Sequence, residues 1–205
     1  GAGASILSGS VSVVPAINTN SPSGLAIFSF RNAGATVTEA GVPAVPSGAA
    51  FRLYAEASGV FGAVGSIQTG IAIANTSASA VTVTLELSKL DGSATGLTGT
   101  LQIPANGQVA TFLNQIQGFT SMQTPFQGVL RVSSSGSISV AGLRGRYNER
   151  SDFLITTTPA VNEAAPASTS TLYFPQIADG GGYTTQFILF SGAPGQVSSG
   201  TMQLF

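Results

Sequence analysis

The sequence has no cysteine, no histidine and no tryptophan, and only 7% of its 205 residues are charged. Without cysteine and histidine the chain cannot form disulfides, thiolate nucleophiles, the usual zinc sites or a Ser-His-Asp catalytic relay. Charged residues make up about 25% of an ordinary globular protein. These absences predict a protein that is not an enzyme and that holds no metal ion and no cofactor.

The few charges are also close to balanced. Seven Lys and Arg against eight Asp and Glu give a net charge of −1. So little positive charge cannot neutralise a phosphate backbone or hold the chain to an anionic membrane surface. Gly, Ser, Thr or Pro breaks every apolar run long before the roughly 18 residues that a membrane helix needs. We therefore predict no nucleic-acid partner and no membrane insertion.

Apolar residues are nevertheless plentiful, at 43% of the chain with twelve Phe among them. This content is enough to build a core and is unlike that of a disordered chain. The sequence starts at Gly1 without a basic and apolar leader segment. We therefore expect any export signal to have been removed or to lie upstream.

Short runs rich in Val, Ile, Phe, Leu and Thr, bounded by Gly, Pro, Asn or Ser, dominate the chain and indicate an all-β fold. The clearest alternation lies between residues 81 and 88, where Val and Leu take every second position. That period predicts a strand with one buried face. The only predicted helix is a single turn at Leu113–Gln117. The predicted strands are Ser10–Val14, Leu25–Phe30, Thr36–Glu39, Phe51–Ala57, Gly70–Ala74, Val81–Leu90, Gly99–Ile103, Gln108–Phe112, Gln127–Ser133, Ser137–Tyr147, Phe153–Thr158, Leu172–Ile177, Thr184–Phe190 and Gly200–Phe205.

Three segments recur later in the chain, in the same order and at nearly the same offset, which predicts a divergent tandem repeat. The matching pairs are Thr36–Val45 with Asp152–Val161, Arg52–Tyr54 with Thr171–Tyr173, and Thr69–Ile73 with Thr185–Leu189. The offset is 116 residues in the first and third pairs (36 to 152, 69 to 185) and 119 in the second (52 to 171). The strands at Ser10–Val14 and Gln127–Ser133 are then equivalent as well.

A repeat of about 117 residues has the size of an immunoglobulin-like sandwich. The sequence thus predicts two tandem immunoglobulin-like β-sandwich domains, residues 1–118 and 119–205, the second lacking its last strands. We prefer this division because Gly118–Pro125 reads as a loop and the first unit is then complete. The alternative places linkers at the Pro-rich stretches Gly41–Gly48 and Pro159–Ser170, leaving one whole unit between two halves.

The second predicted sandwich has an open sheet edge, which another segment must cover. A continuation of the polypeptide, Gly1–Leu7 of the same chain, or the N-terminal arm of a neighbouring copy could do so. The last possibility predicts a head-to-tail fibre completed by strands from neighbours. The candidate assembly residues are Ser5, Ile6, Leu7, Val11, Val13, Met202, Leu204 and Phe205.

Several long strings resemble a repeat block that is common in large secreted bacterial proteins. They are PSGLAIFSF (22–30), TEAGVPA (38–44), FRLYAEASG (51–59), TGIAIAN (69–75), PANGQVATFLNQI (104–116), LRGRYNERSDFLITTTP (143–159) and DGGGYTTQFILFSG (179–192). The resemblance implies export, tandem arrangement and an extracellular or bacterial cell-surface location. It implies no biochemical activity and supplies no catalytic residue.

One third of the charges fall near a single predicted loop, Asn148–Ser151. These residues are Arg144, Arg146, Glu149, Arg150 and Asp152, and Tyr147 and Tyr183 are possible aromatic platforms for a sugar. Arginine forks in such a cluster could bind a carboxylate, a sulfate or a partner loop. The preferred interpretation is a hairpin whose charges pair across strands and protect an edge from aggregation.

These observations favour a non-catalytic extracellular structural or adhesive module that contacts copies of itself or adjacent repeats. The alternative is a module of a larger exported protein that binds a polysaccharide or another surface polymer. A fibre predicts that deleting residues 1–14 abolishes assembly. A polymer-binding module predicts that changing Arg146, Tyr147 or Tyr183 abolishes retention on the polymer.

Overall fold

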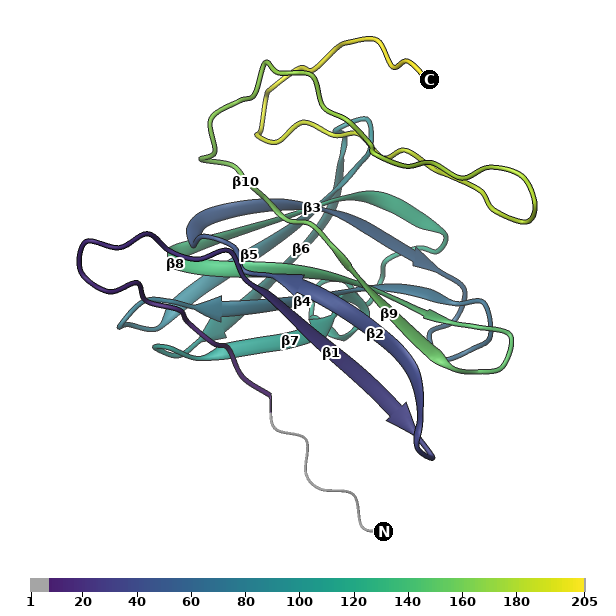
Figure 1. Ribbon diagram of the computed structural model, residues 1–205, viewed down its shortest axis with the longest axis horizontal. Coiled ribbons are helices and arrows are strands. Elements are labelled where there is room, and N and C mark those ends of the chain that lie inside the picture. Colours follow the sequence, from purple (N-terminus) through teal and green to yellow (C-terminus); the bar gives the residue numbers. More distant parts are fainter. Residues whose placement is uncertain (1–7, 205) are drawn as a thin grey trace.

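The structure is a computed structural model, and it describes residues 8–204. It confirms the all-β prediction, with an eight-stranded antiparallel sheet curled around one core (Figure 1). Its elements are β3 (Gly48–Ser58), β4 (Ile67–Asn75), β5 (Val81–Lys89), β6 (Ala94–Ile103), β7 (Gln108–Phe112), the 3-10 turn η1 (Leu113–Gln115), β8 (Phe126–Tyr147), β9 (Phe153–Thr158) and β10 (Val161–Asn162). A separate two-stranded sheet contains β1 (Leu25–Asn32) and β2 (Ala35–Pro43).

Strand β8 organises the curled sheet because it belongs to both of its layers. Residues 126–134 of β8 lie between β3 and β5, whereas residues 138–147 lie between β4 and β9. Two strands were predicted here, with a break at residues 134–136. The structure has one strand that passes through this Ser-Ser-Gly stretch from one layer to the other.

The core lies between the two layers. Every second residue of β3 and β5 faces it, as the period-2 pattern predicts. Its fully buried members include Leu53, Ile71, Ile73, Val83, Leu85, Leu130, Val132 and Ile138. Burying each such side chain contributes about 1.5–3 kcal/mol, so β8 is needed to cover both halves of the core.

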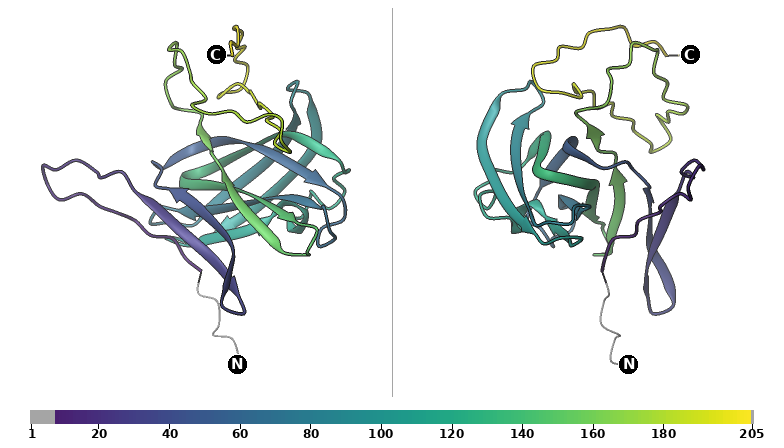
Figure 2. Two further views of the ribbon diagram at one scale, coloured as in Figure 1. Left: turned by 45° about the vertical axis from the view of Figure 1, so that its right-hand side comes forward. Right: turned by 90° about the vertical axis from the view of Figure 1, so that its left-hand side faces the viewer.

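The β1–β2 hairpin packs beside β9 through side chains that bond to backbone groups. The Thr38 hydroxyl accepts a hydrogen bond from the Ile155 amide at 3.0 Å and donates to the Ile155 carbonyl at 3.3 Å. Thr157 of β9 donates to the carbonyl of Gly41 at 2.7 Å. Figure 2 shows the hairpin projecting from the side of the curled sheet.

The C-terminal segment, defined here as residues 163–204, lies above the curled sheet and contains no named strand (Figures 1 and 2). It folds back on itself at Gly180 and Tyr183, which form an isolated bridge. The Thr185 hydroxyl donates to the Ala178 carbonyl at 2.7 Å and holds the two arms together.

Four predicted strands are wrong for the described residues: Ser10–Val14, Leu172–Ile177, Thr184–Phe190 and the described part of Gly200–Phe205. Each has strand composition but no neighbouring strand to receive its backbone hydrogen bonds. A lone extended segment gains no ladder and therefore no strand structure.

The division predicted at residues 118 and 119 does not separate two sheets. Strand β8, from the second predicted domain, pairs with β3, β4 and β5 of the first. The eight-stranded unit instead runs from residue 48 to 162, so it begins at the end of one Pro-rich stretch, Gly41–Gly48, and ends inside the other, Pro159–Ser170. Among residues 8–204, no helix is long and apolar enough to cross a membrane.

Candidate functional site

The predicted charge cluster lies on the hairpin that joins β8 to β9. Register pairs Tyr147 with Phe153, and Asn148 builds the loop between them. The Asn148 side-chain oxygen accepts hydrogen bonds from the amides of Arg150 and Asp152 at 2.9 and 2.8 Å. This amide-to-backbone bonding is typical of turns that begin at Asn.

Each arginine of the cluster already has a carboxylate partner. Arg146 contacts Glu149 at 2.8 Å, and Arg150 contacts Asp152 at 3.1 Å. Arg144 reaches from β8 to Glu56 on β3 at 2.7 Å. An anionic ligand would have to displace these partners, so the arrangement is better suited to holding the hairpin than to binding an anion.

The carboxylate of Asp152 is held in its charged form. Hydrogen bonds from Asn148 and then Arg150 lower the pKa of Asp152 below its ordinary value. A general acid needs the opposite shift. Within the described residues, no three Asp or Glu side chains gather in a way that could hold a metal ion.

The two tyrosines of the predicted site occupy different surroundings. Tyr147 belongs to an aromatic cluster, with its ring 4.9 Å from Phe153 and 5.8 Å from Phe61. Tyr183 lies on the turn of the C-terminal segment and is exposed. No hydrogen bond or ring contact within residues 8–204 joins Tyr183 to the arginine cluster, so the structure does not unite the predicted polymer site.

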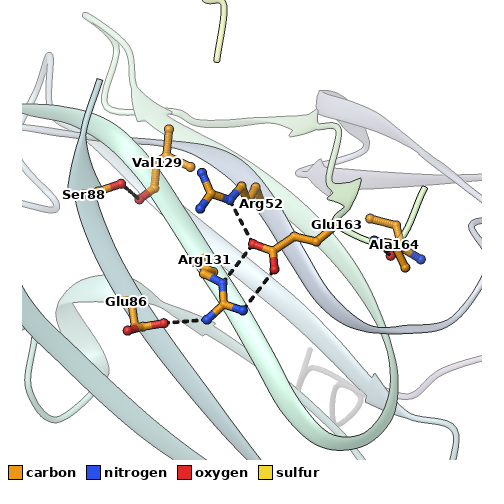
Figure 3. Close-up of polar contacts among 8 residues, drawn as sticks. Arg52, Glu86, Ser88, Val129, Arg131, Glu163 and Ala164 are labelled. Atoms are coloured by element: carbon orange, nitrogen blue, oxygen red, sulfur yellow. Dashed lines mark hydrogen bonds and ion pairs between the residues drawn. The ribbon is translucent and has the colours of Figure 1, made fainter. Parts of the chain in front are cut away.

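A second charged group, which sequence reasoning missed, lies on the outer face of the sheet (Figure 3). Arg52, Arg131 and Glu86 sit directly opposite one another on β3, β8 and β5. Glu163, just after β10, contacts both arginines at 2.9 Å, and Arg131 also contacts Glu86 at 2.9 Å. The four residues are far apart in sequence, so only the strand register brings them together.

Glu163 keeps the two facing arginines from repelling each other. Burial raises its pKa, but hydrogen bonds from Arg131 and Arg52 outweigh burial and hold the pKa of Glu163 below its ordinary value. The hydrogen bonds that Arg131 donates to Glu163 raise the pKa of Arg131 in turn. Since Glu163 begins the C-terminal segment, this ion network fixes the point where that segment leaves the sheet.

The C-terminal segment crosses back over the same face. A groove of about 550 Å³ lies between the strands that carry the ion network and residues 190–197 of the segment. Its walls contain the charged side chains of Arg52, Glu86 and Arg131 together with the end of β5 and the turn that follows it.

The predicted assembly residues that the structure describes are exposed and outside any strand. These are Val11, Val13, Met202 and Leu204. Ser5, Ile6, Leu7 and Phe205 lie outside the described residues. Further apolar side chains are exposed before β1, on the β1–β2 hairpin and on the C-terminal segment: Val14, Ile17, Leu25, Ile27, Phe28, Phe30, Leu172, Tyr173, Phe174, Ile177 and Leu189. The period-2 pattern of these segments predicts that such residues share one face of a strand. It does not show that nothing packs against that face.

Comparison with known proteins gives little further information. No protein-family model matches the chain, and no curated protein matches it. A solved structure, described as the crystal structure of Thermotoga maritima 1070, aligns with 53% of this chain and 91% of its own length at 10% identity and a TM-score of 0.41. The chain is similar to it only at this level.

Proposed function

We propose that the chain is a non-catalytic structural or adhesive module that assembles with copies of itself or with adjacent repeats of the same kind. The sequence resemblance supports an extracellular or bacterial cell-surface location. In this proposal the module carries no cofactor and acts through protein contacts.

The observation that carries the proposal is the uncovered apolar surface at both ends of the described chain. The β1–β2 hairpin exposes Leu25, Ile27 and Phe30, and the C-terminal segment exposes Leu172 and Phe174. A large exposed apolar surface usually marks a site of protein association. The centre of the molecule, by contrast, has a closed core and paired charges.

The tandem repeat is part of the proposal. We place one complete sandwich unit at residues 48–162, with the hairpin before it and the C-terminal segment after it as pieces of equivalent units. This is close to the alternative division of the sequence, except that the start of the second Pro-rich stretch, up to Asn162, belongs to the sheet. The single curled sheet supports it because its strands close around one core.

Sedimentation and negative-stain electron microscopy of the purified chain test the proposal. We expect mass to rise with protein concentration, and filaments with a repeat of about one or two sandwich lengths. A monodisperse monomer at every concentration would contradict assembly. Retention on a surface polysaccharide that is lost on Tyr183→Ala, in a chain that stays monomeric, would favour the polymer-binding alternative.

A further inference from the structure

We propose that residues 10–43 of one copy complete the C-terminal segment of a second copy, in the register in which β8 pairs with β3 and β4. This inference rests on the proposed function and names its contact. The donor is the N-terminal arm together with the β1–β2 hairpin. The acceptor is residues 171–189.

The first argument is the register of the hairpin. In β1–β2, Ala26 lies opposite Val42 and Phe30 lies opposite Thr38. Moving each number by the repeat offset of 116 gives positions 142 with 158 and 146 with 154. Those are the observed partners in β8–β9. From Ala26 to Phe30 the hairpin therefore has the pairing of β8 and β9, and only its last pairs, after the register shift at Arg31, differ.

The second argument compares the exposure of equivalent positions. Leu53 of β3 and Ile73 of β4 are 0% and 1% exposed, whereas their equivalents Leu172 and Leu189 are 79% and 66% exposed. The acceptor thus has apolar residues at the positions that face the core in β3 and β4, but in the acceptor these residues are exposed. Its arms already approach each other, since the Phe174 and Phe187 rings lie 5.0 Å apart.

The donor shows the same contrast. Leu130 of β8 is fully buried, and its equivalent at the 116-residue offset, Val14, is 83% exposed. Leu130 pairs with Leu53 in the complete unit. The equivalent contact joins Val14 to Leu172, two side chains that both lack cover. Strand addition of this kind supplies backbone hydrogen bonds to both partners and buries alternate side chains.

The complete unit also fixes the register of the second contact. Gly70 lies opposite Leu143 and Thr69 lies opposite Arg144. The equivalent pairs are Ile27 with Gln186, and Phe28 with Thr185. No hydrogen bond within the described residues joins the hairpin to the C-terminal segment of its own chain, so both surfaces are available to another copy.

Cysteine cross-linking tests this register directly because the natural chain has no cysteine. Two singly substituted chains of different tagged length, one Ile27→Cys and one Gln186→Cys, are mixed and oxidised. A second mixture uses Phe28→Cys with Thr185→Cys. Adjacent antiparallel pairs alternate between wide and close spacing, so one of the two mixtures has the geometry that a disulfide prefers.

The matched control is Ile27→Cys mixed with Phe187→Cys. Residue 187 neighbours 186 in sequence but faces the other side of the strand. We expect a mixed-length disulfide dimer in at least one in-register mixture, several-fold above the control. Equal yields in all mixtures would overturn the register. A chain with both Ile27→Cys and Gln186→Cys that forms only an internal disulfide would overturn exchange between copies.

Sedimentation of the same samples separates this inference from the proposed function. Assembly without an in-register disulfide overturns the pairing and leaves the proposed function standing. A chain that neither assembles nor cross-links overturns both. Assembly together with the in-register disulfide supports both.

Discussion

At the scale of single residues, the ion network around Glu163 could not be predicted from the sequence. Glu163 is one of eight acidic residues and belongs to no motif. Its place opposite Arg52 and Arg131 depends on β10 pairing with β3 and on β8 pairing with β3. The charge cluster on the β8–β9 hairpin, by contrast, is visible in the sequence because its members are close along the chain.

Glu163→Gln should destabilise the fold by about 1.5–3 kcal/mol, the range for hydrogen bonds to charged groups. The substitution leaves Arg52 and Arg131 facing each other without a carboxylate. Glu149→Gln, which breaks the exposed pair with Arg146, should cost at most about 1 kcal/mol. Urea unfolding of the three proteins measures the difference, and equal costs for the two variants would contradict the role given to Glu163.

The same variant should change the response to acid. Because the folded-state pKa of Glu163 is lowered, the unfolded chain binds more protons there, and stability rises with pH. The contribution is complete above the unfolded value of about 4.3. It is lost as pH falls through the lower folded value. Between about pH 5 and pH 2, the free energy of unfolding measured in urea should therefore fall less steeply for Glu163→Gln than for the unsubstituted chain. If the two proteins lose stability in parallel, the lowered pKa of Glu163 is contradicted.

Gly118, in the loop that precedes β8, is a position where only glycine fits. Its φ is +99°, and an added Cβ would collide with the carbonyl of Thr98. Gly118→Ala should therefore cost more than the ~1 kcal/mol of the backbone conformation alone. Gly62 is a matched control, because its φ is +95° but nothing lies within 4 Å of an added Cβ. Thermal unfolding should give a clearly lower midpoint for Gly118→Ala than for Gly62→Ala.

At the scale of elements, sequence periodicity predicted the central strands well. Gln108–Phe112 and Phe153–Thr158 have the predicted bounds, and the predicted turn at Leu113–Gln117 contains η1. The strands of the N-terminal arm and C-terminal segment were wrong for a reason that periodicity cannot detect. Alternating apolar residues predict a segment with one buried face, but the segment forms a strand only where a neighbouring strand receives its backbone hydrogen bonds.

The contact between β2 and β9 gives an element-scale prediction. Thr38→Val removes both hydrogen bonds to the Ile155 backbone and should loosen the β1–β2 hairpin without unfolding the curled sheet. Hydrogen exchange should become faster in residues 25–43 and stay unchanged in β4 and β8. Thr156→Val, next to the contact on the exposed side of β9, is the control. Loss of protection throughout the sheet would show that the hairpin is part of the same cooperative unit.

At the scale of the whole molecule, the sequence predicts a repeat with an offset of about 116 residues and a domain boundary at residue 118, and the strand pairing crosses that boundary. The loop at Gly118–Pro125 resembles a linker in composition. It lies within the unit, however, because the strand that follows it pairs on both sides with earlier strands. Long-range pairing of this kind leaves no local mark on the sequence.

Two fragments separate the two boundaries. Residues 46–165 contain every strand of the curled sheet and Glu163 with both of its arginine partners. We expect this fragment to unfold cooperatively and to remain monomeric, because it lacks the donor and acceptor surfaces.

Residues 1–118 lack β8, so the inner faces of β3, β4 and β5 would lose Leu130, Val132 and Ile138 from the core. Losing even one such side chain costs about 2–5 kcal/mol, and a domain has only about 5–15 kcal/mol of stability. Circular dichroism and urea titration should therefore show a folded 46–165 and an unfolded or aggregated 1–118. A cooperative transition in residues 1–118 would instead restore the division at residue 118 as the boundary of an independent domain.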